Sequence, residues 1–233
     1  MTPPRSEPPT SHRPQQPTPN PLTPSTWGVY LVTDRAQTDG RPLTDVIAAA
    51  LQGGIRAVQL RERDLPTREL LALAERLRAV TRAAGAALLI NDRIDVALAC
   101  DADGVHLPAA SFAIADARAL LGPQRLIGVS THTPDEVAAA ARAGADFAVF
   151  GPIYDTPSKR AYGTPLGLAK FAQVRSAVTL PLFAIGGIDL GQVEEVRAAG
   201  ADGIAVIRAI LAVPDPARAA ADLLRLSDRS GDL

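Results

Sequence analysis

The stretches AGADFAVF at residues 143–150 and AGADGIAV at 199–206 repeat one pattern, and CDADGVHL at 100–107 is a variant of it. In each stretch a helical segment ends at small residues, an aspartate follows, and an apolar run begins. Gly144 and Gly200 suit the left-handed conformation that often follows the last turn of a helix. The repeat therefore predicts units in which a helix leads into a strand.

Short apolar runs of this kind recur along the chain, separated by segments rich in Ala, Leu and Arg with helical spacing. Alternating strands and helices are typical of parallel α/β folds, and eight such units are typical of a closed barrel. The sequence thus predicts an α/β protein with a single (β/α)₈ TIM barrel. The eight runs lie at residues 28–33, 57–60, 87–90, 104–107, 126–130, 147–150, 182–185 and 203–207.

In such a barrel the starts of the strands form the face that serves stability, whereas catalytic groups follow the strand ends. Asp103, Asp146 and Asp202 each come directly before a predicted strand. We therefore expect these three aspartates to have no catalytic role and look for the site at the other end of the strands.

The bulk composition limits the class of protein. The 233 residues have a formal net charge of −1, which gives no sign of a nucleic-acid partner, and 47 % of them are hydrophobic, which is enough for a full core. No apolar run approaches the ~18 residues that a membrane span needs. The single cysteine, Cys100, excludes an intramolecular disulfide. Its apolar surroundings predict a small buried residue at a helix end rather than a nucleophile.

The first 26 residues contain nine of the twenty prolines, with Ser, Thr and Gln between them. They lack the apolar segment of a signal peptide, so we expect a cytoplasmic protein. This composition predicts a disordered Pro-rich tail over residues 1–26, followed by the catalytic barrel domain over residues 27–233.

Gln59, Arg61 and Arg63 end the second predicted strand at alternate positions, which places the three side chains on one face of an extended segment. Two arginines at a barrel mouth predict an anionic ligand, because the guanidinium group matches the geometry of phosphate. The alternative is a structural cluster of arginines with Glu62.

Asn91 and Asp92 end the third predicted strand. An aspartate at such a position is often accompanied by a second carboxylate, a metal ion or a cation. The loop after the fourth strand, residues 108–112, contains Ser111 but no acidic residue. A metal ion at this place would therefore depend on Asp92 alone among the side chains.

His132 follows the fifth predicted strand and directly precedes a helix start. Thr133 with Glu136 fits a capping box, and Pro134 fits the first helical position. The positive end of the helix dipole favours a neutral imidazole, which is a competent general base near pH 7. The alternative is a histidine that only hydrogen-bonds to loop backbone.

The segment after the sixth strand, residues 151–167, is long for a barrel loop, which is typical of an active-site lid or a binding loop. It contains two hydroxyl groups and one of only two lysines. Thr156, Ser158 and Lys159 together are a candidate grip for an oxyanion.

Gly186 and Gly187 follow the seventh predicted strand and allow backbone N–H groups to approach a phosphate closely. The loops after the seventh and eighth strands are the usual phosphate site of this fold. Arg208, just past the eighth strand, adds positive charge there.

Taken in order, motifs that span residues 30–211 resemble the thiamine phosphate synthase/TenI family. The resemblance implies a TIM barrel and one of two activities. The synthases join hydroxymethylpyrimidine diphosphate to thiazole phosphate with the help of Mg²⁺, and the TenI-like members shift a proton to aromatise thiazole phosphate carboxylate without a metal. The motifs are YLVTD (30–34), GGIRAVQLRERD (53–64), INDRIDVALA (90–99), DGVHL (103–107), IGVSTHT (127–133), GADFAVFGPIYDTPSK (144–159), FAIGGI (183–188) and AGADGIAVI (199–207).

The resemblance also implies roles for individual residues. The pyrimidine diphosphate site matches Gln59, Arg61, Arg63, Asn91 and Asp92, with Asp92 reaching Mg²⁺. Phosphate- and carboxylate-binding positions match Ser130, Thr156, Ser158 and Lys159. The thiazole phosphate site matches Gly187, with Gly186 beside it, Ile207 and Arg208, although the family more often has a small hydroxyl residue at the place of Arg208.

Ser111 stands where the synthases have their second metal-binding aspartate. On this ground the sequence favours the TenI-like tautomerase, with His132 as the base and no cofactor. The alternative is the Mg²⁺-dependent synthase, and a third interpretation is a non-catalytic barrel that senses thiamine-pathway phosphates. All three predict small-molecule phosphates as partners, and the sequence does not give the oligomeric state.

Overall fold

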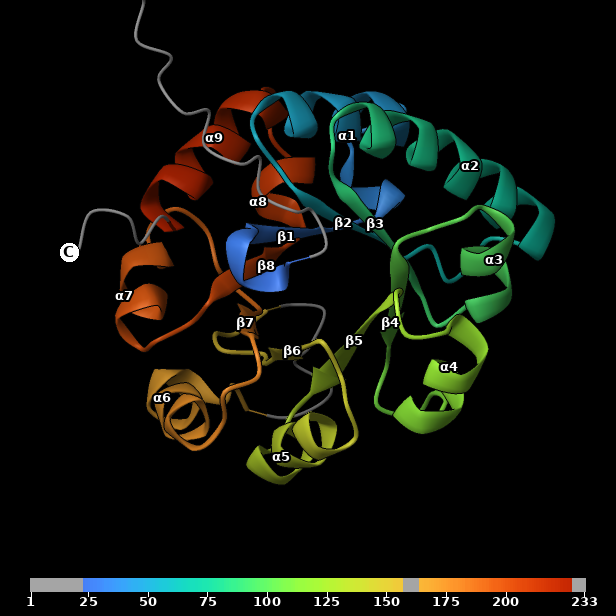
Figure 1. The fold of residues 1–233 in the computed structure, drawn as a ribbon. Helices are drawn as coiled ribbons and strands as arrows, with labels where there is room; N and C mark the ends of the chain where they lie inside the picture. The colour runs from blue at the N-terminus through green and yellow to red at the C-terminus, as the bar shows by residue number, and fades with distance from the viewer. Residues whose placement is uncertain (1–22, 157–163, 228–233) are drawn as a thin grey trace, which may run out of the picture.

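The computed structural model describes residues 23–156 and 164–227, and their eight parallel strands close into a barrel in sequence order (Figure 1). The predicted (β/α)₈ barrel is confirmed, and each predicted run contains a strand. The Pro-rich segment up to residue 22 lies outside the described residues. The strands are β1 (Gly28–Val32), β2 (Ala57–Leu60), β3 (Ala87–Asn91), β4 (Gly104–Leu107), β5 (Leu126–Thr131), β6 (Phe147–Phe150), β7 (Leu182–Ile185) and β8 (Gly203–Val206).

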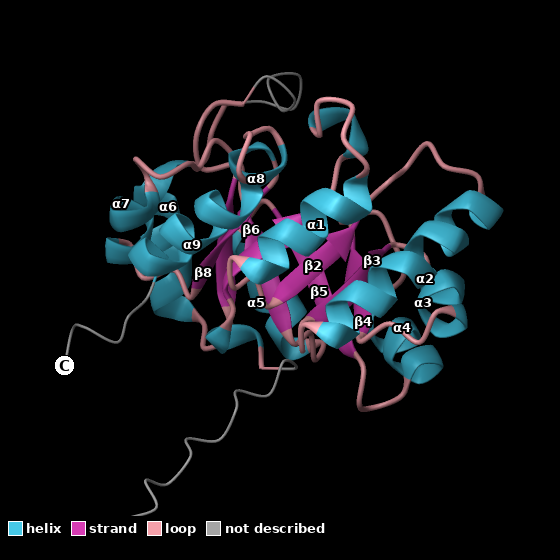
Figure 2. Cartoon of the chain, turned by 90° about the horizontal axis from the view of Figure 1, so that it is seen from above, coloured by secondary structure: helices cyan, strands magenta, loops and turns pink. Residues whose placement is uncertain are grey.

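Helices form a ring around the strands in Figure 1, and the view turned by 90° in Figure 2 shows the short helix α8 beyond one end of the barrel. None of the helices in the described part of the chain is long and apolar enough to cross a membrane. The helices are α1 (Leu43–Gln52), α2 (Thr67–Ala83), α3 (Ile94–Ala99), α4 (Ile114–Leu121), α5 (Pro134–Arg142), α6 (Gly167–Ala177), α7 (Val193–Ala198), α8 (Arg208–Leu211) and α9 (Pro216–Ser227), with 3₁₀ turns η1 (Pro24–Thr26) and η2 (Arg35–Gln37).

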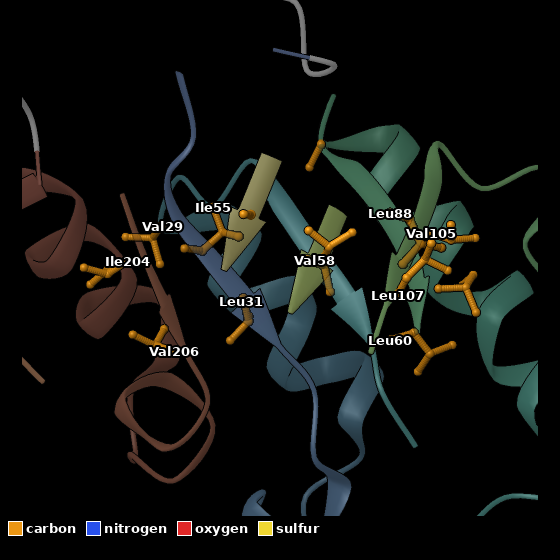
Figure 3. Close-up of a cluster of buried hydrophobic side chains, with 14 of the residues drawn as sticks. Val29, Leu31, Ile55, Val58, Leu60, Leu88, Val105, Leu107, Ile204 and Val206 are labelled. Carbon is orange, nitrogen blue, oxygen red and sulfur yellow. The ribbon is translucent and has the colours of Figure 1, made fainter. Parts of the chain in front are cut away.

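Side chains alternate along each strand between two hydrophobic layers. On β1, Val29 and Leu31 belong to the layer between strands and helices, whereas Tyr30 and Val32 belong to the barrel interior. Figure 3 shows the outer layer, which continues through Val58 on β2 and its counterparts on β3, β4 and β8. The same alternation decides which residues near the strand ends point into the barrel.

Aromatic rings fill the barrel floor, the end at which the strands start. Trp27, Tyr30, Phe147 and Phe183 are buried against one another, with the rings of Trp27 and Phe147 edge to face at 5.2 Å between centroids. Gly128 faces this cluster, and a Cβ atom there would lie 2.2 Å from the Phe147 ring. The lack of a side chain at Gly128 of β5 therefore makes room for the aromatic rings of the floor.

We expect Gly128→Ala to lower the free energy of unfolding by about 1–3 kcal/mol, because the added methyl group overpacks the Phe147 ring. Urea unfolding monitored by circular dichroism measures the change. Gly191→Ala is a matched control, since a Cβ atom at Gly191 meets nothing closer than an Asp189 oxygen at 3.4 Å. Equal stability of the two variants would contradict this account of the floor.

The three aspartates of the sequence repeat tie helices to strand starts. Each carboxylate accepts a hydrogen bond from the backbone N–H of the first or second residue of a neighbouring strand. Each also pairs with an arginine of a helix. The three pairs are Arg78–Asp103 at 2.7 Å, Arg118–Asp146 at 2.6 Å and Arg175–Asp202 at 3.0 Å. All of them lie at the floor, where they tie helices to the starts of strands.

Cys100 is buried just after α3, as predicted, and burial raises the pKa of its thiol. A buried thiol with a raised pKa is a poor nucleophile. Cys100 therefore belongs to the packing of the barrel wall and not to the site.

Candidate active site

The candidate site lies at the barrel mouth, the end at which the strands finish. Gln59, Asn91 and Ser130 occupy inward-facing positions near the ends of β2, β3 and β5. Parallel pairing sets Asn91 beside His106 of β4. The alternation and the closed sheet together bring these polar side chains to one end of the barrel.

The end of β2 also carries a cluster of charges centred on Arg35. The carboxylate of Glu62 accepts from the Arg35 backbone N–H at 3.1 Å and from its guanidinium at 3.1 Å, and Asp64 pairs with the same guanidinium at 2.5 Å. Hydrogen bonds to Arg35 hold the pKa of Asp64 below its usual range. Arg35, which the sequence patterns did not reveal, thus pairs with both acids of the segment that contains Arg61 and Arg63.

Asp92 adopts a left-handed backbone conformation at the tip of β3, with φ of +66°. Its backbone N–H donates to the His106 carbonyl at 2.9 Å, and its carboxylate accepts from the Ser111 hydroxyl. Non-glycine residues in this conformation are uncommon and gather at functional sites. Ser111 therefore contacts Asp92 directly, and its hydroxyl is a donor to the carboxylate rather than a second negative charge.

A chain of hydrogen bonds crosses the barrel interior below the mouth. Gln59 Nε2 donates to the Tyr30 hydroxyl at 3.2 Å, this hydroxyl lies 3.5 Å from His106 Nδ1, and His106 Nε2 lies 2.9 Å from Ser130 Oγ. Burial, with a smaller effect of the positive charge of Arg61, lowers the pKa of His106 to about 3. The His106 imidazole is therefore neutral near pH 7.

Sequence reasoning gave neither Tyr30 nor His106 a role. Their inward direction can be read from the alternation of apolar residues in β1 and β4. The contact between the two side chains cannot be read from the sequence, because Tyr30 and His106 lie 76 residues apart and meet only when the barrel closes.

His132 follows β5 and lies at the start of α5, where the predicted cap is confirmed: Thr133 Oγ1 accepts from the Glu136 N–H at 3.2 Å. The Glu136 carboxylate reaches back to the His132 N–H at 2.6 Å. His132 Nδ1 lies 2.6 Å from the Gly151 carbonyl oxygen, which can only accept, so Nδ1 carries the hydrogen. His132 thus bonds to loop backbone through Nδ1 and not through Nε2.

The loop after β6 is fixed to β7 at its described start. The Ile153 N–H donates to the Ile185 carbonyl at 2.8 Å, and the Tyr154 N–H donates to the Gly186 carbonyl at 3.0 Å. Thr156 follows in the same segment and is partly buried. Two other predicted contacts of this loop, Ser158 and Lys159, lie outside the described residues.

Gly186 and Gly187 have positive φ angles of +102° and +69°. A Cβ atom at Gly186 would lie 2.7 Å from Pro152, and one at Gly187 would lie 2.7 Å from Tyr154. Contact with the loop after β6 therefore requires glycine at both positions, whether or not a phosphate binds there. Ile207 and Arg208 follow β8 at the same end of the barrel, with the Arg208 side chain exposed.

Residues 29–210 match the family model described as thiamine monophosphate synthase. This chain belongs to the thiamine phosphate synthase/TenI family. The resemblance inferred from the sequence motifs is thereby confirmed over most of the barrel.

Individual relatives agree with the family assignment. The chain is 49 % identical to the thiamine-phosphate synthase of Albidiferax ferrireducens over 200 residues, which cover 86 % of this chain and 91 % of the relative. It is 43 % identical to that of Moorella thermoacetica over 204 residues, with 88 % and 97 % covered. The structure of thiamine phosphate pyrophosphorylase from Pyrococcus furiosus matches with a TM-score of 0.80 at 34 % identity, covering 88 % of this chain and 96 % of the other.

These relatives of the thiamine phosphate synthase/TenI family favour the synthase, the alternative of the sequence analysis, over the tautomerase that it placed first. The preference for the tautomerase depended mainly on Ser111, a single loop position. The similarity to the synthases extends over most of the chain and so has more weight.

The mouth offers few ligands for a metal ion. In the described segments no group of three or more His, Cys, Asp or Glu residues could hold one. Mg²⁺ is nevertheless often bound by one or two carboxylates together with substrate phosphates. The exposed carboxylate of Asp92 fits a Mg²⁺ ion that arrives with a diphosphate, but not a preformed metal cage.

The buried His106 predicts a specific dependence of stability on pH. Its pKa is about 3 in the folded protein and near 6.5 in the unfolded chain, so below pH 6.5 the unfolded chain binds a proton that the folded protein does not. The contribution of neutral His106 to the free energy of unfolding is therefore fully present above pH 6.5. It decreases by about 1.4 kcal/mol per pH unit from there toward pH 3.

We therefore expect the unfolding free energy of the wild type to fall by about 2–3 kcal/mol more than that of His106→Gln between pH 7.5 and 4.5. Urea unfolding at both pH values measures the difference and cancels the effects of the carboxylates that both proteins share. Parallel losses in the two proteins would contradict a buried neutral His106.

Proposed function

We propose that this protein is a thiamine phosphate synthase. In the proposed reaction the bond between the pyrimidine methylene carbon and the diphosphate oxygen breaks, and its electron pair leaves with the diphosphate. The lone pair of the thiazole nitrogen then forms the new carbon–nitrogen bond. The observation that carries this proposal is the meeting of basic and acidic groups at the ends of β2 and β3, in a chain whose named relatives are synthases.

The end of β2 is the proposed site of the departing diphosphate. Arg61 and Arg63 supply guanidinium groups, which suit phosphate oxygens, and Glu62 and Asp64 of the same segment pair with Arg35. Gln59, Asn91 and Ser130 are polar side chains on inward-facing positions at the same end of the barrel. Charges and donors held in place before the reaction stabilise the negative charge that develops on the leaving group.

Asp92, which follows β3, is the residue that would hold Mg²⁺ beside this diphosphate, and Asn91 before it is assigned to the diphosphate itself. The ion supplies charge neutralisation that makes diphosphate a better leaving group. The Ser111 hydroxyl keeps the Asp92 carboxylate in position, which compensates in part for the absence of a second acid at this loop position.

The thiazole phosphate is proposed to bind across the barrel mouth, at the loops after β7 and β8. Gly187 is exposed there, with Gly186 partly buried beside it, and Arg208 adds positive charge. This placement fixes the thiazole nitrogen against the pyrimidine carbon, and such positioning is a large part of catalysis in a reaction between two bound molecules.

The test is the formation of thiamine phosphate from hydroxymethylpyrimidine diphosphate and thiazole phosphate by the purified protein with Mg²⁺. We expect many turnovers per protein molecule and none when EDTA is present. Binding of both phosphates with no product, beside a working control synthase, would instead support the non-catalytic barrel.

His132 gives a second candidate function, the tautomerase. Its Nε2 carries a lone pair at the mouth of the barrel, held by the bond from Nδ1 to Gly151. A tautomerase would convert thiazole phosphate carboxylate alone, without metal, and would lose this turnover in His132→Asn. Absence of conversion by the wild type under metal-free conditions would remove this candidate.

A further inference from the structure

The hydrogen bonds inside the barrel have a direction that follows from counting hydrogens. The Tyr30 hydroxyl accepts from Gln59 Nε2, so its own hydrogen needs another acceptor. Within the described residues, His106 Nδ1 at 3.5 Å is in reach. A buried hydroxyl that donates to no acceptor costs free energy, which favours the arrangement in which Tyr30 donates to Nδ1.

An imidazole that accepts a hydrogen bond at one ring nitrogen carries its hydrogen on the other nitrogen. If Nδ1 accepts from Tyr30, this hydrogen is on Nε2 and points to Ser130 Oγ at 2.9 Å. Ser130 is then the acceptor in its bond to the barrel interior. The hydrogen of its own hydroxyl is left for the mouth, where the anion is proposed to bind.

We propose that Tyr30 and His106 are positioning residues that hold the Ser130 hydroxyl as a hydrogen-bond donor toward an anionic ligand at the barrel mouth. The chain runs from Gln59 through Tyr30 and His106 to Ser130, and every member donates to the next. In the reverse direction Ser130 would donate inward and present only lone pairs to the anion, which would repel it. The identity of the anion as diphosphate rests on the proposed function, whereas the direction of the chain does not.

The imidazole tautomer can be observed directly in the intact wild-type protein. The sequence contains only three histidines, His12, His106 and His132, so long-range ¹H–¹⁵N spectra contain three sets of ring signals. At neutral pH we expect His106 to carry its hydrogen on Nε2, and His132 to carry it on Nδ1 while it is neutral. A His106 ring with its hydrogen on Nδ1 would overturn the proposal.

Pyrophosphate binding tests whether the chain acts through Ser130. Isothermal titration with inorganic pyrophosphate and Mg²⁺ would compare the wild type with His106→Leu, Ser130→Ala and the double variant. We expect about tenfold weaker binding for Ser130→Ala and about fivefold for His106→Leu. The double variant is expected to bind as weakly as Ser130→Ala and no more weakly. Additive losses would overturn the proposal.

A conservative replacement separates positioning from folding. The amide of His106→Gln can accept from Tyr30 and donate to Ser130, so we expect its pyrophosphate affinity to stay within about twofold of the wild type. If His106→Leu does not fold, Tyr30→Phe replaces it in the same cycle. We expect Tyr30→Phe to weaken pyrophosphate binding when Ser130 is present. In the Ser130→Ala protein we expect Tyr30→Phe to weaken pyrophosphate binding no further.

The failure of this proposal and that of the proposed function are distinguishable. A protein that binds pyrophosphate but responds to Ser130→Ala alone, and not to His106→Leu, refutes the positioning chain and leaves the synthase intact. A protein that makes no thiamine phosphate but has the expected His106 tautomer and the expected pyrophosphate cycle refutes the synthase and leaves the chain intact.

Discussion

Asp92→Asn is expected to lower kcat/KM for thiamine phosphate formation by about 10²–10³-fold, which corresponds to about 3–4 kcal/mol of transition-state stabilisation. Asp92 is the carboxylate that follows β3 at the mouth, and Ser111 stands where the related synthases are expected to have a second one. Loss of its charge leaves Mg²⁺ with the diphosphate and neutral groups only. Initial rates over a range of Mg²⁺ concentrations measure the effect, and the required Mg²⁺ concentration is expected to rise.

Asp92→Asn removes the negative charge and keeps the shape of the side chain. Asparagine tolerates the left-handed conformation of Asp92 and keeps an oxygen that can accept from Ser111. Asp39→Asn is the matched control, because Asp39 also has a positive φ of +53° and is exposed. An Asp92→Asn enzyme with unchanged rate and unchanged Mg²⁺ requirement would contradict the role given to Asp92.

Arg61→Met is expected to lower kcat/KM by about 10²-fold or more, because a charged donor that stabilises the leaving diphosphate is lost. Arg61→Lys is expected to recover only part of the activity, since an ammonium group does not bind two phosphate oxygens in the manner of a guanidinium. Steady-state kinetics with the pyrimidine diphosphate as the varied substrate measure both variants.

Arg68→Met serves as the control for Arg61. Arg68 is an exposed arginine in the first turn of α2, with no part in the proposed site. Both variants remove one positive charge from the same region, so a general electrostatic effect would reduce both rates alike. Equal rates for the two would contradict a direct contact between Arg61 and the diphosphate.

The sequence predicted the fold because each strand has a local signal. The alternation in β1, the repeat around Asp146 and the small residues at helix ends can all be read without neighbours. The cap formed by Thr133 and Glu136 is local too, and the structure contains it. Strand count and order then followed from the repetition of these units.

Contacts between strands could not be predicted in this way. Alternation shows that Tyr30 and His106 point inward, but their heights in the barrel depend on the register of the closed sheet. For the same reason the pairing of Glu62 with Arg35 could not be seen, since η2 approaches β2 only in the folded chain. Sequence patterns therefore located the mouth, and the structure supplied the network beneath it.

The choice between the synthase and the tautomerase branch of the family also depends on contacts that the sequence does not show. Ser111 in place of an acid left Asp92 as the one predicted metal ligand and favoured the tautomerase, because a sequence shows the side chain but not its partner. In the structure the Ser111 hydroxyl donates to Asp92. This arrangement supports the remaining carboxylate, so the substitution is compatible with a Mg²⁺-dependent reaction.

The most direct test of the synthase is to measure pyrophosphate and thiamine phosphate in the same reaction. We predict that both appear at equal rates when Mg²⁺, hydroxymethylpyrimidine diphosphate and thiazole phosphate are present, and that neither appears when thiazole phosphate is replaced by buffer or Mg²⁺ is removed. Pyrophosphate release without thiamine phosphate, or no release while a control synthase is active, would contradict the account.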